Sequence, residues 1–139
     1  MKTLFETEVT ATGGREGQAK SKDGHLQVKL AFPPELGGPK DSTATNPEQL
    51  FAAGYAACFE SALRLVARNK KVTFTATSVT ARVSLLGTPE GGFKLAVGLR
   101  ASIPGVDPAT AQGLVEEAHK ICPYSNATRG NIDVSVEAV

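Results

Sequence analysis

The sequence predicts an α+β fold with a mostly antiparallel sheet and two helices, in the order βββ-α-ββ-α-β. Three observations support this fold class. Apolar and polar residues alternate with a period of two near both ends of the chain, Asn46-Pro47 opens a long apolar segment, and Asp107-Pro108 opens a second one. With 139 residues, the chain is expected to form a single domain over residues 1–139.

Strand signals come first along the chain. Thr3–Thr12 is rich in β-branched and aromatic residues, which favour strands. The Asp-Gly pair in Lys22–His25 predicts a type I′ hairpin turn. A half-buried strand is expected after this turn, where the alternating apolar residues are Leu26, Val28, Leu30 and Phe32. The Pro- and Gly-rich stretch Phe32–Asn46 is interpreted as a long surface loop.

The first helix is expected to run from Pro47 to about Asn69 or Lys70. Asn46 is a good N-cap, Pro47 suits the first helical position, and Gln49 can reach back as in a capping box. Gly54 lies in the helix interior, where glycine is unfavourable by about 1 kcal/mol relative to alanine. A packing reason is therefore expected at Gly54.

Strands return after Lys71. Val72, Phe74 and Ala76 share one face, but the alternation slips before Val79, and a bulge near Thr77 or Ser78 would absorb the slip. Thr88–Gly92 is expected to be a turn before a strand from Phe93 to Ile103. Asp107-Pro108 starts the second helix, Pro123 ends it, and a last strand is expected over Ile132–Val136.

Composition narrows the possible functions. The net charge of +1 gives no basic surface of the kind that binds nucleic acid, and 41% hydrophobic with 21% charged residues is typical of a soluble globular protein. The start of the chain lacks the pattern of a signal peptide, and no apolar run approaches the roughly 18 residues of a membrane span. The cytoplasm is therefore the expected compartment, where disulfides are rare and usually catalytic.

Cys58 has two interpretations. It lies on an apolar stripe of the first helix, so it is either an inert core thiol or a nucleophile. A nucleophile needs a thiolate, and Cys58 is too far from the helix start for the helix dipole to stabilise one. A cation must then come from elsewhere. Arg15, framed by glycines, is the candidate, although it could also be a charge at a hairpin tip.

Cys122 is expected at a helix C-terminus, where the dipole disfavours a thiolate. If one cysteine attacks and the other resolves, this position leaves Cys58 as the attacker, provided that a cation lies near it. A zinc site made of Cys58, Cys122, His119 and His25 is the alternative use of these residues. Only His119 and Cys122 have the close spacing that structural zinc sites usually show.

Two long segments resemble a known family. Asn46–Phe59, which contains Cys58, and Cys122–Asn131 resemble the two cysteine segments of the organic hydroperoxide resistance proteins. These belong to the wider family that includes osmotically inducible protein C. Gly14–Gly17 matches as well, and the resemblance covers essentially the whole chain in the same order.

The resemblance implies an OsmC-like fold, an intertwined homodimer with active sites near the subunit interface, and a thiol peroxidase. Cys58 would attack an organic hydroperoxide and Cys122 would resolve the sulfenic acid as a disulfide. Arg15 would lie beside the Cys58 thiolate and Glu48 would hold Arg15 in place. It implies a dithiol reductant, dihydrolipoyl groups rather than thioredoxin. No metal or bound organic cofactor is expected, and no nucleic-acid or membrane partner.

The apolar stripe around Cys58 would favour hydroperoxides with organic tails over hydrogen peroxide, because burying apolar surface contributes about 25 cal/mol per Å². Two other functions stay open on the residues alone. A long apolar helix against an antiparallel sheet could also serve an acyl-thioester hydrolase or binder. The chain could equally be a non-catalytic dimerisation module with two inert core thiols.

Overall fold

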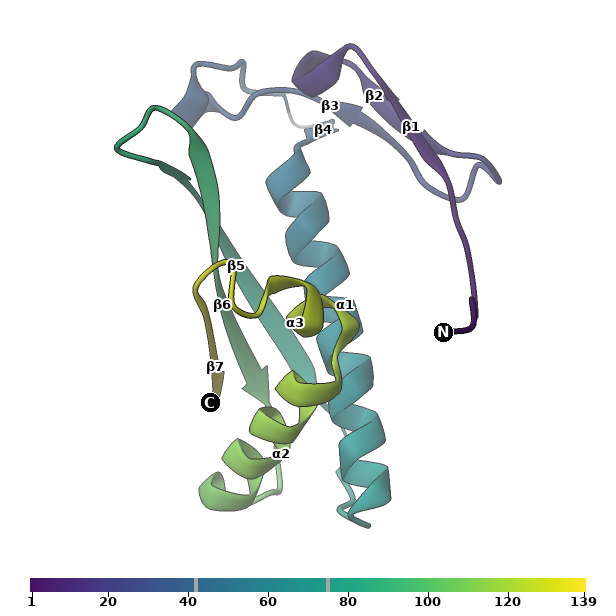
Figure 1. The fold of residues 1–139 in the computed structure, drawn as a ribbon, viewed down its shortest axis with the longest axis vertical. Helices are drawn as coiled ribbons and strands as arrows, with labels where there is room; N and C mark the ends of the chain where they lie inside the picture. The colour runs from purple at the N-terminus through teal and green to yellow at the C-terminus, as the bar shows by residue number, and fades with distance from the viewer. Residues whose placement is uncertain (42, 75) are drawn as a thin grey trace. The chain divides into compact units, whose positions relative to one another are not determined.

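The computed structural model describes residues 1–41, 43–74 and 76–139 and has a mixed α+β architecture (Figure 1). The chain forms two compact units, Met1–Leu50 and Phe51–Val139. The described residues contain two sheets, one in each unit, and three α-helices. The α+β class and the order of the expected elements are confirmed, with one short strand and one short helix in addition.

The first unit is built around a four-stranded sheet. Its strands pair in chain order, antiparallel except for the last pair, and are β1 (Val9–Thr12), β2 (Gln18–Ser21), β3 (Gln27–Leu30) and β4 (Ala44–Thr45). The expected β2–β3 hairpin forms, but its turn is not type I′. That turn needs positive φ at two central residues, and of Asp23 and Gly24 only Gly24 has it.

The stretch expected as a surface loop, Phe32–Asn46, carries some regular structure. It contains a 3₁₀ turn, Pro34–Leu36, and the strand β4. Ser42 of this stretch lies outside the described residues.

Helix α1 (Pro47–Asn69) begins and ends as the sequence predicts. The Gln49 amide donates to Asn46 Oδ1 at 2.8 Å, which confirms the N-cap. The capping box is only half formed, because the Gln49 side chain accepts a hydrogen bond from the Thr45 hydroxyl instead of returning to Asn46. At the other end Lys71 has a φ of 56°, and Val72 N–H donates to Ala67 O at 2.9 Å, which is the pattern of a Schellman motif.

The second unit contains a three-stranded sheet. Long strands β5 (Ser78–Gly87) and β6 (Phe93–Ser102) are antiparallel, and β7 (Val134–Ala138) pairs parallel to β6. The alternation from Val79 onward lies in β5 as expected, but the strand expected at Val72–Ala76 and the bulge after it are wrong for the described residues. Strand β5 starts only at Ser78, and Val72 and Phe74 pack against the core from non-strand chain. Thr75 lies outside the described residues.

Pro123 has a second effect that the sequence analysis missed. Helix α2 (Pro108–Ile121) starts at its expected cap, where the Thr110 amide donates to Asp107 at 3.0 Å. Pro123 ends this helix, but it also begins a short helix, α3 (Pro123–Thr128). Cys122 is thus the single extended residue between two helices, with φ −61° and ψ 123°.

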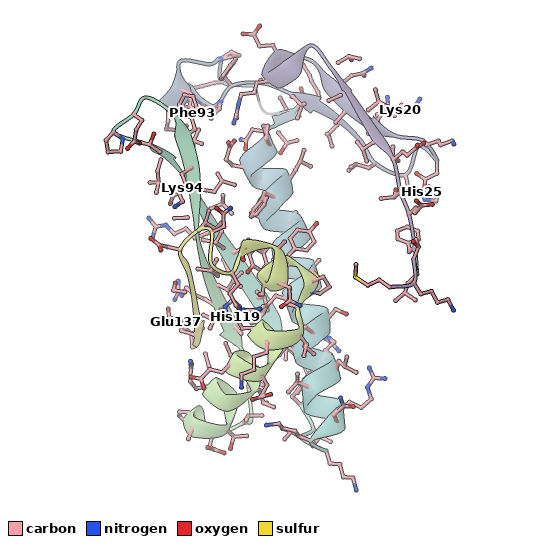
Figure 2. The ribbon with its side chains drawn as sticks, viewed as in Figure 1. Lys20, His25, Phe93, Lys94, His119 and Glu137 are labelled. Atoms are coloured by element: carbon pink, nitrogen blue, oxygen red, sulfur yellow. The ribbon has the colours of Figure 1, made fainter. Side chains whose placement is uncertain are left out.

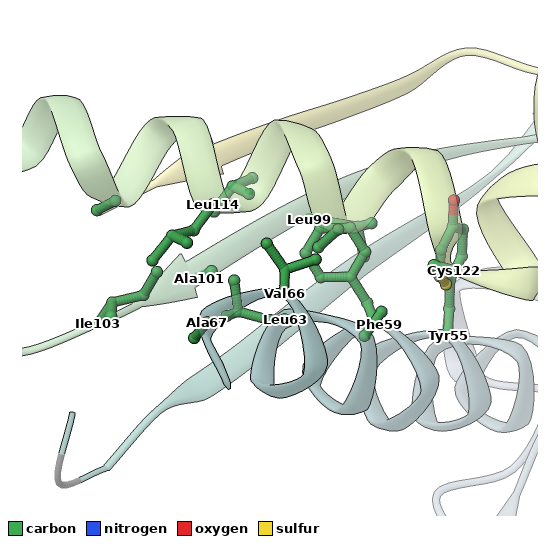
Figure 3. Packing of buried hydrophobic residues seen from close by; sticks show 14 of the residues in the cluster. Tyr55, Phe59, Leu63, Val66, Ala67, Leu99, Ala101, Ile103, Leu114 and Cys122 are labelled. Atoms are coloured by element: carbon green, nitrogen blue, oxygen red, sulfur yellow. The ribbon is translucent and has the colours of Figure 1, made fainter. Parts of the chain in front are cut away.

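One hydrophobic cluster holds the second unit together. Helices α1 and α2 both pack against Val97, Leu99 and Ala101 of β6 and against Ile103, which follows the strand. Figure 3 shows Leu99, Ala101 and Ile103 beside side chains of the two helices. By length and mean hydropathy α1 could cross a membrane, which the sequence analysis did not expect. Core helices pass the same test, and α1 places Tyr55, Phe59 and Leu63 fully inside this cluster.

Candidate functional site

The two cysteines come together in the second unit. Cys58 projects from α1 and is partly buried, whereas Cys122, between α2 and α3, is fully buried. Both are free thiols, and Cys122 Sγ donates a hydrogen bond to Cys58 Sγ over 3.7 Å. A disulfide bond measures about 2.05 Å, so the two sulfurs must approach by only about 1.7 Å to join. The pair is arranged as a reduced dithiol that can close to a disulfide.

The surroundings within this unit favour the neutral form of Cys58. Burial raises the pKa of the Cys58 thiol above its ordinary value, and the neighbouring Cys122 sulfur raises it further. The backbone N–H of Tyr124 donates to Cys58 and acts in the opposite direction. The described groups next to Cys58 in Phe51–Val139 therefore do not generate the thiolate that a nucleophile needs.

Tyr124 packs across the helix that carries Cys58. Its ring lies 6.3 Å from that of Phe51 and 5.6 Å from that of Tyr55, measured between ring centres. A Cβ atom on Gly54 would meet Tyr124 Oη at 2.5 Å and two ring carbons at 3.1 Å. The Tyr124 ring thus packs directly on Gly54, which confirms that this glycine has a packing reason. Tyr124 is not among the site residues predicted from the sequence.

Arg15 and Glu48 form an ion pair in the first unit. Arg15 Nη1 and Nη2 donate to the two carboxylate oxygens of Glu48 at 2.8 and 2.5 Å, and the side chains are 28% and 17% exposed. This bidentate contact raises the pKa of Arg15 and lowers the pKa of Glu48. The Arg15 guanidinium also lies 5.9 Å from the centre of the Phe32 ring.

Glycines shape the hairpin tip that carries Arg15. The residue lies in a 3₁₀ turn, Gly14–Glu16, between paired strands β1 and β2. Gly13 and Gly14 have φ of 74° and 55°, and a Cβ on Gly17 would meet Thr12 O at 1.7 Å. The unusual angles and close approach expected for this segment are therefore present. The predicted place of Arg15 beside the Cys58 thiolate stays a prediction.

Arg64 and Arg129, two cations of the second unit, have partners of their own. Arg64 pairs with Glu60 at 2.6 Å, and Arg129 donates to Asn126 and to the carbonyl of His119. His119 lies near the end of α2 (Figure 2), where burial lowers its pKa and the charge of Arg129 lowers it further. Both effects favour the neutral form of the His119 ring. In the described residues no group of three or more His, Cys, Asp or Glu side chains is placed to hold a metal ion.

The chain is similar to several known proteins over most of its length. The family model described as "OsmC-like protein" matches residues 38–137. The organic hydroperoxide resistance protein of Xanthomonas axonopodis pv. citri is 52% identical over 136 residues, which cover 97% of this chain and 94% of the relative. The organic hydroperoxide resistance protein OhrA of Bacillus subtilis is 52% identical over 96% of this chain and 95% of its own length.

A solved structure agrees with the fold over nearly the whole chain. The crystal structure of an organic hydroperoxide resistance protein from Elizabethkingia anophelis superimposes with a TM-score of 0.94 at 52% identity. It covers 99% of this chain and 98% of the solved one. The OsmC-like fold expected from the sequence is thereby confirmed.

Proposed function

This chain belongs to the OsmC-like family, among its organic hydroperoxide resistance proteins, and on that premise we propose that it is a thiol peroxidase that reduces organic hydroperoxides through Cys58 and Cys122. The observation that carries the proposal is the 3.7 Å contact between the two sulfurs. A peroxidase with a resolving cysteine needs such a reduced pair, one sulfur accessible to substrate and the other close behind it.

The chemistry runs in two balanced steps. The Cys58 thiolate attacks the distal peroxide oxygen, the O–O bond breaks, and the alkoxide takes a proton and leaves as the alcohol. Cys58 is then a sulfenic acid. The Cys122 thiol attacks its sulfur, water leaves, and the Cys58–Cys122 disulfide forms. Cys122 acts as the resolving residue because it is buried against Cys58 and inaccessible to bulk peroxide.

Arg15, held by Glu48, is the proposed source of the positive charge that the Cys58 thiolate needs. Because burial raises the pKa of Cys58, a cation must stabilise its thiolate. Arg15 keeps its charge at every physiological pH, and its planar fork can also orient a peroxide oxygen. Two of its donors already bind Glu48, which fixes the guanidinium. In the proposal, Arg15 activates Cys58 within an intertwined homodimer and Glu48 positions Arg15.

The partners follow from the same chemistry. The substrate is an organic hydroperoxide, and turnover needs a dithiol that attacks the protein disulfide and leaves as its own disulfide. Dihydrolipoyl groups are the proposed reductant, and the cytoplasm is the proposed compartment. An acyl-thioester hydrolase or binder, or an inert dimerisation module, would use neither thiol.

Counting thiols after a single addition of peroxide tests the proposal. The reduced protein is treated with one equivalent of tert-butyl hydroperoxide, and free thiols are titrated before and after. The parent should lose both thiols, Cys122→Ser should lose its one thiol, and Cys58→Ser should keep its one thiol. Cys58→Ser should also be inactive in turnover with a dithiol. The proposal fails if the parent keeps both thiols or if Cys58→Ser retains substantial peroxidase activity.

A further inference from the structure

A largely buried hydrogen-bond network joins the segments on either side of Cys122, and we propose that it positions Cys122 against Cys58 and so sets the rate of disulfide closure. Its members are Tyr55 on α1, His119 on α2, and Ser125 and Thr128 on α3. This inference rests on the proposed function, since it concerns the second step of that reaction. It assigns Tyr55, His119 and Ser125 as positioning residues.

Ser125 is the centre of the network. Its hydroxyl lies 2.7 Å from His119 Nδ1 and 3.0 Å from Tyr55 Oη. Tyr55 Oη is also 3.1 Å from Thr128 Oγ1, and the Thr128 hydroxyl donates to the Ser125 carbonyl at 3.2 Å. Tyr55 and Ser125 are fully buried, and Thr128 is 6% exposed. Buried polar groups with several partners form a rigid network, because leaving one of them unpaired is unfavourable.

The residues of the network are spaced so that they connect the segments that carry the two cysteines. His119 stands three residues before Cys122 and Ser125 three residues after it, so their contact joins the end of α2 to the start of α3 across the cysteine. Tyr55 stands three residues before Cys58, about one helical turn away on the same side of α1. Tyr55 and Cys122 lie at the same end of the hydrophobic cluster (Figure 3). The Tyr55–Ser125 contact therefore ties the Cys122 turn to the helix that carries Cys58.

The restraint matters because closure needs only a short and directed movement. The sulfurs start 3.7 Å apart and must approach by about 1.7 Å with the geometry that a disulfide requires. Cys122 has extended backbone angles, and its N–H and carbonyl bond to Ala118 and Asn126 in the two adjoining helices. The position of its sulfur therefore depends on how α2 and α3 are held relative to each other. A displacement of about 1 Å at a reacting group can slow a step by up to about a hundredfold. Loosening the network should thus affect closure more than the first oxidation, in which Cys122 forms no covalent bond.

The test separates the two steps in time. Reduced protein is mixed rapidly with tert-butyl hydroperoxide, and the formation of the Cys58 sulfenic acid and of the disulfide are followed by quenched mass spectrometry. For Tyr55→Phe, which keeps the ring and removes the hydroxyl, the first step should stay within about twofold of the parent. Closure should slow about tenfold. Sulfinic acid at Cys58 should accumulate under excess peroxide, because the sulfenic acid lives longer.

Companion variants distinguish positioning from general loss of packing. Ser125→Ala should behave as Tyr55→Phe does. His119→Ala should slow closure, and His119→Asn, which keeps a hydrogen-bonding group near the Nδ1 position, should recover part of the rate. Ile103→Val is the matched control, since it truncates the same core at its opposite end (Figure 3) and should change neither step.

Each outcome decides the inference. If Tyr55→Phe and Ser125→Ala close within twofold of the parent, or if their two steps slow together, the inference is overturned. The same holds if Ile103→Val slows closure as much as they do. If the parent forms no sulfenic acid and no disulfide, the proposed function fails instead, and the two failures are therefore distinguishable.

Discussion

Gly54→Ala should disturb the Cys58 site although the change adds one methyl group to a helix. In an exposed helix interior this substitution is favourable by about 1 kcal/mol. Here the new Cβ would lie 2.5 Å from Tyr124 Oη, whereas ordinary contacts begin near 3.4 Å. The phenol must therefore move by about 0.9 Å. Overpacking of this kind usually destabilises by about 1–3 kcal/mol, so the net expectation is a loss of about 1 kcal/mol.

Displacement of the Tyr124 ring should also raise the pKa of the Cys58 thiol. The Tyr124 backbone N–H donates to Cys58 and is the one neighbour that lowers its pKa among the causes described above. Weakening this hydrogen bond by about 1.4 kcal/mol would raise the pKa of Cys58 by about one unit. At a pH below that pKa, the thiolate fraction and the rate of thiol alkylation would then fall about tenfold.

Two measurements check this expectation. Thermal unfolding of the reduced protein should show a lower Tm for Gly54→Ala, by roughly 4 °C. The pH dependence of iodoacetamide alkylation, measured in a Cys122→Ser background so that only Cys58 reacts, should shift to higher pH. Tyr124→Ala supplies the control, because without the ring Gly54→Ala should stabilise the helix. The reasoning is refuted if Gly54→Ala raises the Tm of the parent and leaves the alkylation profile unchanged.

Two further predictions concern Arg15 and Glu48. Arg15→Ala should raise the apparent pKa of Cys58 and slow the oxidation of Cys58 at neutral pH. Arg15→Lys should recover only part of the rate, because an ammonium lacks the planar fork. The measurement is the single-turnover oxidation rate across pH, and an unchanged pKa together with an unchanged plateau rate would contradict the role of Arg15. Since Arg15 lowers the pKa of Glu48, the pair stabilises the fold above the ordinary carboxyl pKa and this contribution is lost as pH falls through the lowered value. In Glu48→Gln the unfolding free energy should consequently depend less on pH in the acid range. The same dependence as in the parent would show that the Arg15–Glu48 pair does not stabilise the fold.

Local signals predicted the helix boundaries well. Asn46 and Asp107 cap α1 and α2 as expected, because each cap is a hydrogen bond to an amide three residues away. The glycines around Arg15 and the glycine at position 54 were also identified by rules that depend on one residue and its backbone. Such features are determined by neighbours in the chain, so a sequence contains them directly.

The wrong predictions concern segments whose structure depends on distant partners. Val72 and Phe74 alternate as in a strand, but in the described part of this segment they belong to no strand and pack against the core. The period-two pattern reports burial on one side, which a packed loop can satisfy as well as a strand. Pro123 was interpreted only as a helix end, although its fixed φ is equally suited to begin α3.

For the site, the sequence by itself determined the candidates: two cysteines in two recognisable segments, with Arg15 and Glu48 added as a pair by the resemblance that those segments carry. It could not determine that Tyr55 would bond to Ser125, 70 residues away, or that the two sulfurs would lie 3.7 Å apart. Those distances are set by how α1, α2 and α3 pack around one core. The pKa of Cys58 depends on the same packing, because burial and the Tyr124 amide act on the thiol only once the chain has folded.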